Sequence, residues 1–125
     1  MNSCTCSEET IGPAGGTLEI AGGHTLHFPA GALQDSMTIR AVRDPLHIVV
    51  DLGPEGLVFP DSARPTLTFK YQGGGLLGLL NPADFVVLYL DQGVVLDVLP
   101  TVVDRQARTA TAELEHFSTY AFATD

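Results

Sequence analysis

The chain has 125 residues, of which 6 are Lys or Arg and 15 are Asp or Glu, so its formal net charge is −9 with neutral histidines. Hydrophobic residues make up 45% and charged residues 17% of the sequence, a balance typical of folded domains and not of disordered chains. The negative charge, with no cluster of Lys or Arg, excludes binding through nucleic-acid phosphates or anionic lipid headgroups. The length predicts one domain, which we expect to be monomeric.

No segment is typical of a membrane span or a leader. The longest apolar run, Phe85 to Leu90, contains a tyrosine and is far shorter than the ~20 residues that a spanning helix needs. The first residues, Met1-Asn2-Ser3-Cys4-Thr5-Cys6, lack the apolar core of a signal peptide, so a leader is either absent or already removed. We expect no membrane insertion, and the compartment stays open.

Both cysteines lie in a polar N-terminal segment, residues 1–10, which we expect to be flexible. Cys4 and Cys6 are separated by a single residue, a spacing that we interpret as too short for an unstrained disulfide between them. We therefore predict no internal disulfide, and leave open a metal, a lipid or an intermolecular disulfide. The folded domain is expected over residues 11–125.

Glycine and proline punctuate short β-branched runs, which predicts an all-β sandwich with almost no helix. Four segments alternate between apolar and other residues, as half-buried strands do. These predicted strands cover residues 24–28, 36–42, 46–52 and 65–71. Their inward faces are expected to carry Leu26 and Phe28; Met37, Ile39 and Ala41; Leu46, Ile48, Val50 and Leu52; and Leu67, Phe69 and Tyr71.

A first hairpin is predicted in the C-terminal half, from strands 84–91 and 93–99. They are joined by Asp91-Gln92-Gly93, in which glycine supplies the positive φ that such turns commonly need. Because both strands are almost wholly apolar, we expect this hairpin at the centre of a sheet.

A second hairpin is predicted from strands 102–103 and 107–114, joined by Asp104-Arg105-Gln106. Ala110, Ala112 and Leu114 are expected to face inward, with Thr109, Thr111 and Glu113 outward. The final strand is expected over residues 118–123.

Two connections have distinctive sequences. Pro29-Ala30-Gly31-Ala32-Leu33 predicts a tight turn, since proline fixes φ and glycine lets the chain reverse. Residues 72–81 are rich in glycine and contain Leu76, Leu77, Leu79 and Leu80. These leucines either close the open end of the sandwich or mark a partner site.

Three motifs follow one another along the chain: Gly15-Gly16-Thr17-Leu18, then Leu26-His27-Phe28-Pro29-Ala30-Gly31-Ala32-Leu33, then Leu52-Gly53-Pro54-Glu55-Gly56-Leu57-Val58-Phe59 with Pro65. In this order and spacing they resemble the ZU-five domain, the β-sandwich shared by tight-junction scaffolds, netrin receptors, ankyrins and a death-domain adaptor. The resemblance extends from about Ile11 to Ala123 and implies a single antiparallel β-sandwich. We interpret the motif prolines and glycines as structural, not as binding residues.

The tripeptide His116-Phe117-Ser118 is similar to the one at which some ZU-five domains, and unrelated nucleoporin domains, cut their own chain between Phe and Ser. The resemblance implies that the Ser118 hydroxyl attacks the Phe117 carbonyl carbon and converts the amide into an ester, which water hydrolyses. His116 would take the hydroxyl proton and later protonate the freed amine. Ser118, His116 and Phe117 are thus the predicted catalytic residues of a single-turnover self-cleavage, with no external substrate.

This reaction needs a strained peptide, because resonance keeps an ordinary amide planar and unreactive. Twisting a peptide bond costs about 1 kcal/mol for a ~12° change in ω, and more beyond. Packing of Tyr120 and Phe122 downstream, and of Leu114 upstream, is expected to hold the two sides of the Phe117–Ser118 bond. The two pieces are expected to stay associated after cleavage.

The alternative is a non-catalytic protein-interaction or spacer module in which the tripeptide is purely structural. Ser118 would then bond to a neighbouring backbone group, and His116 would cap the turn. Such a module would hold a partner, still unidentified, through a strand edge or the leucine-rich segment.

Other candidate sites are weaker. His24 and His27 are three apart in a strand and so face opposite sides, and His47, near Asp51, is expected to point outward. We interpret these histidines as surface residues. Gly73-Gly74-Gly75 lacks the spacing and the Gly-Lys-Ser/Thr end of a phosphate loop, so neither a metal nor a cofactor is predicted.

Overall fold

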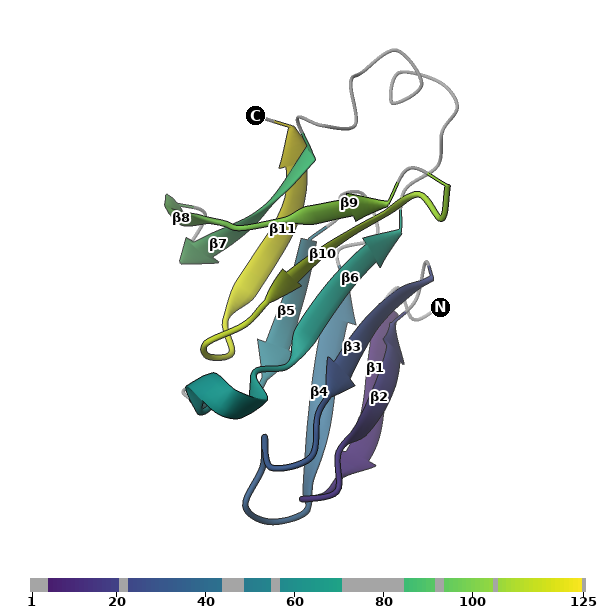
Figure 1. Ribbon diagram of the computed structural model, residues 1–125, viewed down its shortest axis with the longest axis vertical. Coiled ribbons are helices and arrows are strands. Elements are labelled where there is room, and N and C mark those ends of the chain that lie inside the picture. The colour runs from purple at the N-terminus through teal and green to yellow at the C-terminus, as the bar shows by residue number, and fades with distance from the viewer. Residues whose placement is uncertain are drawn as a thin grey trace.

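Two antiparallel β-sheets pack face to face (Figure 1). The computed structural model describes residues 5–20, 23–43, 49–54, 57–70, 85–91, 94–104 and 106–124. The strands are β1 (Thr5–Ile11), β2 (Gly16–Ile20), β3 (His24–Phe28), β4 (Met37–Arg43), β5 (Val49–Gly53), β6 (Thr66–Lys70), β7 (Phe85–Asp91), β8 (Val94–Leu99), β9 (Val102–Asp104), β10 (Thr109–Glu113) and β11 (Thr119–Thr124). One turn of 3₁₀ helix, η1 (Asp61–Ala63), precedes β6. The predicted all-β sandwich is confirmed.

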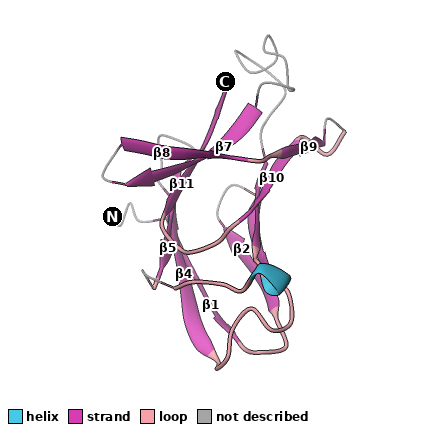
Figure 2. Ribbon diagram, turned by 60° about the vertical axis from the view of Figure 1, so that its left-hand side comes forward, coloured by secondary structure: helices cyan, strands magenta, loops and turns pink. Residues whose placement is uncertain are grey.

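Strands that are consecutive in the chain form the edges of the two sheets. β1 and β2 are the edge strands on one side of the sandwich, and β8 and β9 are those on the other. The six-stranded sheet has the order β1-β4-β5-β11-β7-β8, and the five-stranded sheet has the order β2-β3-β6-β10-β9. At these two edges the chain passes from one sheet to the other, from β1 to β2 and from β8 to β9. It also crosses between β3 and β4, β5 and β6, β6 and β7, and β10 and β11. Figure 2 shows β4, β5 and β11 on one side of the sandwich and β10 and β2 on the other. The last strand, β11, lies between β5 and β7 in the interior of its sheet.

The core lies between the sheets, and the period of two residues in each strand determines which side chains enter it. Buried positions from the predicted inward faces include Leu26, Phe28, Ile39, Ala41, Val50, Leu52, Leu67, Phe69, Ala110, Ala112 and Leu114. Met37 is partly buried against this core. The predicted positions Leu46, Ile48 and Tyr71 lie outside the described residues. Where it is tested, the predicted register of the strands is confirmed.

Two of the predicted turns are present. The amide of Ala32 donates to the carbonyl of Pro29 (3.2 Å), and Gly31 between them has a φ of 89°. In the second hairpin, a carboxylate oxygen of Asp104 accepts from the amides of Gln106 (3.0 Å) and Ala107 (3.1 Å). The Asp91-Gln92-Gly93 turn lies partly outside the described residues, and the leucine-rich segment 72–81 wholly so.

Residues 1–10 were predicted to form a flexible segment, but the described part of this segment forms a strand. Thr5–Ile11 forms β1, which pairs along its whole length with β4. Only Ile11 among its described side chains is buried, so this strand shows no apolar alternation. Its position is set by backbone pairing with β4, which the sequence of the segment itself does not indicate.

Cys6 is disulfide-bonded, so a disulfide is the one present among the possibilities considered for the cysteines. The chain's other cysteine, Cys4, lies outside the described residues. In extended backbone, residues two apart face the same side at a Cα separation of roughly 6.6 Å, within the range that disulfides span. Spacing by one residue therefore does not exclude a disulfide in an extended segment.

The apolar hairpin is not central as a whole. β7 lies inside the six-stranded sheet, whereas β8 is its edge strand. Residues Val94 to Val98 are all exposed. An almost wholly apolar sequence, in which Asp97 is the exception within β8, predicted a central hairpin, but no described strand lies beyond β8 in the sheet.

Candidate site at the β10 to β11 connection

The tripeptide His116-Phe117-Ser118 lies where the chain passes from β10 in one sheet to β11 in the other. Its backbone runs beside residues 57–59. The amide of Phe117 donates to the carbonyl of Leu57 (2.9 Å), and the amide of Phe59 donates to the carbonyl of Glu115 (2.9 Å). Upstream, the amide of the buried Leu114 donates to the carbonyl of Pro65 (2.9 Å). These bonds fix the chain on the acyl side of the Phe117–Ser118 peptide.

The side chain of Phe117 is 3% exposed and belongs to a cluster of three aromatic rings. Its ring centroid lies 5.0 Å from that of Phe59 and 5.9 Å from that of Phe28, both in edge-on geometry. Such contacts add about 0.5–1.5 kcal/mol per pair to the burial of the rings. Phe117 is therefore held by its side chain as well as by its amide.

Ser118 is the residue before β11 and lies between β5 and β7, the two strands that flank β11. Its carbonyl accepts a hydrogen bond from the amide of Leu52 on β5 (3.0 Å). Its hydroxyl donates to the carbonyl of Leu90 on β7 (3.2 Å). In this geometry the hydroxyl proton is directed at Leu90 and not at the imidazole of His116, the base that the sequence resemblance implies.

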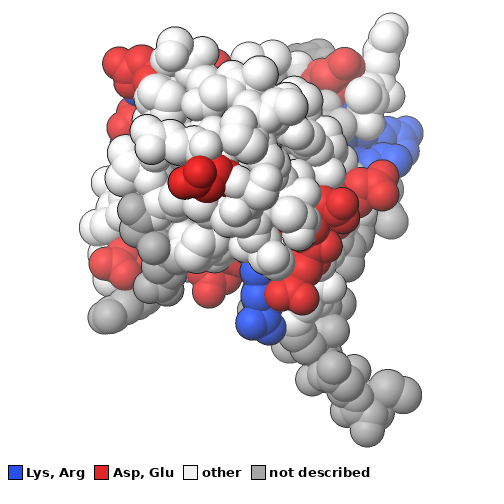
Figure 3. All heavy atoms as spheres, turned by 90° about the horizontal axis from the view of Figure 1, so that it is seen from below, with Lys and Arg blue, Asp and Glu red and all other residues white. Residues whose placement is uncertain are grey.

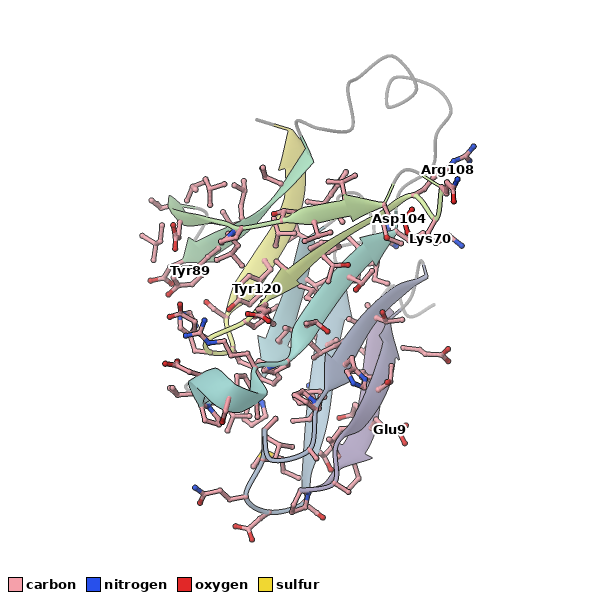
Figure 4. The ribbon with its side chains drawn as sticks, in the orientation of Figure 1. Glu9, Lys70, Tyr89, Asp104, Arg108 and Tyr120 are labelled. Carbon is pink, nitrogen blue, oxygen red and sulfur yellow. The ribbon has the colours of Figure 1, made fainter. Side chains whose placement is uncertain are left out.

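The imidazole of His116 packs edge-on against Tyr89, with 4.7 Å between ring centroids. Both side chains line a pocket of about 190 Å³ that also includes Tyr120, Glu115 and residues of β8. Tyr120 pairs with Tyr89 across β11 and β7 and donates a hydrogen bond from its hydroxyl to the backbone carbonyl of His116. Figure 4 shows Tyr89 and Tyr120 near one another at this end of the sheet.

Burial raises the pKa of Tyr120 well above its usual value, and the neighbouring Tyr89 and Glu115 raise it further. A phenol is protonated at neutral pH even with its ordinary pKa of ~10, and this shift extends the protonated, hydrogen-bond-donating form to higher pH. From the sequence, Tyr120 was expected only as a packing residue. Tyr89 was missed, because β7 and the tripeptide are brought together only by the pairing of β7 with β11.

The predicted surface position of His24 is wrong, whereas its orientation opposite to the exposed His27 is confirmed. The His24 side chain is 2% exposed and packs edge-on against Phe69. Its Nδ1 accepts from the amide of Lys70 (2.9 Å), and its buried Nε2 has no hydrogen-bond partner among the described residues. Burial, with a smaller contribution from Arg43, lowers the pKa of His24 to about 4, so the ring is neutral at neutral pH.

Within the described parts of the chain, no group of three or more His, Cys, Asp or Glu side chains is placed to hold a metal ion. No helix in those parts is long and apolar enough to cross a membrane. His47, one of the histidines considered from the sequence, lies outside them, whereas Asp51 is exposed and accepts a hydrogen bond from the hydroxyl of Thr119 (3.1 Å).

Comparison with known proteins identifies no matching family model and no matching curated protein. Function is therefore inferred from the geometry of the site.

Proposed function

We propose that this protein is a self-processing β-sandwich of the ZU-five type, which cuts its own chain between Phe117 and Ser118. The observation that carries the proposal is the position of this bond between two anchored segments. Phe117 is held in the aromatic cluster on one side, and Tyr120 is 1% exposed on the other. When the residues on both sides of a peptide bond are fixed independently, that bond can be held away from its relaxed, planar geometry. The packing of the surrounding residues then supplies the energy of the distortion.

The reaction is an intramolecular acyl shift followed by hydrolysis. The Ser118 hydroxyl first rotates away from Leu90, at the cost of one hydrogen bond of about 1 kcal/mol. Its oxygen attacks the carbonyl carbon of Phe117, the C–N bond breaks, and an ester forms while the amine of Ser118 gains a proton. Water then cleaves the ester, which leaves a carboxylate on Phe117 and restores the hydroxyl of Ser118. His116 is the proposed carrier of the proton in both steps.

The strand pairing supports retention of both pieces. β11 pairs with β7 along Thr119–Thr124 and with β5 along Thr119–Ala121. After a cut, residues 118–125 would remain as an interior strand of the six-stranded sheet. Backbone pairing on both sides and burial of Tyr120 would hold this strand in the native fold.

Intact-mass measurement of the denatured protein tests the proposal. The wild type is expected to contain two pieces, one ending at Phe117 and one beginning at Ser118. Ser118→Ala is expected to give only full-length chain, because it removes the nucleophile. Thr119→Ala is the matched control, since it removes the adjacent hydroxyl and should leave cleavage intact. A single full-length mass in the wild type after prolonged incubation, with or without hydroxylamine to trap the ester, overturns the proposal.

Two further variants separate the roles of the residues. His116→Ala is expected to slow cleavage by about 10²–10⁴-fold, the usual contribution of a positioned acid or base. Ser118→Cys is expected to react still, because a thiolate is a good nucleophile for the same acyl shift. Equal rates in wild type and His116→Ala would remove His116 from the mechanism.

A non-catalytic interaction module is the second candidate function, and one observation favours it. β8 is an edge strand that exposes large aliphatic side chains. In such a module the tripeptide would serve only to join the two sheets through Phe117 and the backbone bonds of residues 114–118. Absence of cleavage would leave this function standing.

A further inference from the structure

The strand β8 presents an unusual amount of apolar surface at a sheet edge. Val94, Val95, Leu96 and Val98 are 60%, 50%, 53% and 51% exposed. β8 pairs only with β7 and ends the six-stranded sheet in the described structure, so one side of its backbone has no strand beside it. Within β8 the amide of Val98 donates to the carboxylate of Asp97 (2.9 Å), so a peptide that pairs there would have to displace this side chain. Exposed aliphatic side chains and an edge without a neighbouring strand are the features that allow an extended peptide to join a sheet.

A groove of about 450 Å³ lies where the chain passes from β8 to β9 beside β6 and β10. Leu99, Pro100 and Val102 form much of its apolar wall. Its charged residues are Asp97, Glu113, Glu115 and Arg64. Arg64 already pairs with Asp61 (2.6 Å) and lies 3.8 Å from Glu115, so carboxylates are in excess around the groove.

The rest of the molecule has the same sign of charge. The chain carries a net charge of −9, and acidic side chains outnumber basic ones on the face shown in Figure 3. An apolar groove with excess carboxylates favours a ligand that combines aliphatic and cationic groups.

We infer that β8 and the adjoining groove bind an extended, basic and aliphatic segment of a partner protein, which adds to the six-stranded sheet as a further strand. Main-chain hydrogen bonds to the free side of β8 would supply affinity, and its aliphatic side chains would be covered by those of the peptide. A Lys or Arg of the segment would lie in the groove against Asp97 and Glu113. The surface does not include Ser118, but Leu96 and Asp97 also line the pocket that contains His116, so peptide binding is measured in the uncut Ser118→Ala variant as well as in the wild type.

A second copy of this chain fits the surface poorly. Antiparallel pairing of β8 with itself would bring two chains of charge −9 together. It would also place the two Asp97 side chains close to the two-fold axis that relates the two copies of β8. Like charges across a strand pair are destabilising. Asp97 on the edge thus disfavours self-pairing while favouring a cationic partner.

The test uses a fluorescein-labelled eight-residue peptide of alternating valine and lysine, titrated with the full chain and followed by fluorescence anisotropy. Saturable binding is expected, equally for wild type and for the uncut Ser118→Ala variant. A peptide with glutamate in place of lysine is expected to bind at least tenfold more weakly. A peptide methylated at every backbone nitrogen keeps its charge but cannot pair as a strand, and is also expected to lose at least tenfold.

Protein variants locate the binding surface. Leu96→Thr combined with Val98→Thr keeps strand-forming side chains, removes apolar area and is expected to weaken binding at least tenfold. Val58→Thr is the matched control, because Val58 is 73% exposed but lies outside the surface. Asp97→Asn combined with Glu113→Gln is expected to weaken binding about tenfold and to reduce its dependence on salt.

Three results would overturn the inference: no saturable binding of the valine-lysine peptide, equal binding of the methylated peptide, or equal binding by the Leu96→Thr/Val98→Thr variant. Analytical ultracentrifugation completes the test. A dimer that disappears in that variant would show that a second copy occupies β8, which also contradicts a basic partner.

Discussion

The hydroxyl of Tyr120 donates a hydrogen bond to the backbone carbonyl of His116, four residues earlier in the chain. Tyr120 is buried at the start of β11, so this bond connects an interior strand to the segment just upstream of Phe117 and Ser118. Burial raises the pKa of Tyr120, so the phenol stays protonated and able to donate to a higher pH than an exposed tyrosine would. We infer that Tyr120 positions His116 by holding its backbone, and that Tyr89 restrains the imidazole through their ring contact.

Tyr120→Phe tests this relationship, because it removes the hydroxyl and keeps the ring. Unfolding free energy is expected to fall by about 1 kcal/mol for the lost hydrogen bond. If self-cleavage occurs, its rate is expected to fall about tenfold, the equivalent of ~1.4 kcal/mol of activation free energy. Tyr89→Phe, which retains the edge-on ring, is the control and should change the rate much less. Wild-type cleavage by Tyr120→Phe, measured by intact mass over time, would refute a positioning role.

Stability is expected to fall on acidification because of His24. Its folded pKa of about 4 is below the ~6.5 expected when unfolded, so the unfolded chain binds the proton first as pH falls. The stabilisation is complete above pH ~6.5 and is lost as pH falls toward ~4, by about 3 kcal/mol. Urea denaturation across this range measures the loss.

His24→Asn is the informative variant for that measurement. The asparagine oxygen can accept from the amide of Lys70 as Nδ1 does, but it does not titrate in this range. The pH-dependence of unfolding should therefore be shallower in His24→Asn than in wild type. Parallel pH profiles for wild type and His24→Asn would exclude His24 as the source.

The strand register predicts opposite consequences for adjacent residues of β6. Leu67 is fully buried, so Leu67→Ala is expected to cost roughly 2–5 kcal/mol of unfolding free energy through lost burial and a cavity. Thr68 bonds through its hydroxyl to that of Thr111 (3.0 Å), so Thr68→Ala should cost only about 1 kcal/mol. Chemical denaturation measures both, and equal midpoints would contradict the register.

Two glycines with the same φ allow the cost of a positive φ to be distinguished from the cost of a steric clash. Gly15 and Gly31 both have a φ of 89°, which side-chain-bearing residues rarely adopt. A Cβ on Gly15 would lie 2.4 Å from the carbonyl oxygen of Phe28, whereas the nearest described atom to one on Gly31 is the Cβ of Ala63, at 3.8 Å. Gly31→Ala is expected to cost about 1–2 kcal/mol. Gly15→Ala should cost clearly more in thermal or chemical denaturation, and equal costs would show that the backbone near Phe28 moves freely.

The sequence was sufficient for those features that depend on local periodicity. Alternation at two-residue spacing identified β3, β4, β6 and β10, together with the side chains that they bury, because neighbouring residues of a strand face opposite sides. The Pro29 to Leu33 turn followed from backbone restrictions of proline and glycine. The three residues of the candidate site were also contiguous, so His116, Phe117 and Ser118 were identified without any tertiary information.

Only the tertiary structure decided which strands are neighbours, since pairing joins residues distant in sequence. β1 was missed because its exposed residues are ordered by pairing with β4, and β8 was expected to be central because its apolar composition does not reveal an absent neighbour. His24 and Tyr89 likewise acquire their environments from other strands: Phe69 and Lys70 on β6 in one case, and Tyr120 on β11 in the other. Periodicity determines the face on which a side chain lies, whereas burial and contacts depend on what the fold places against that face.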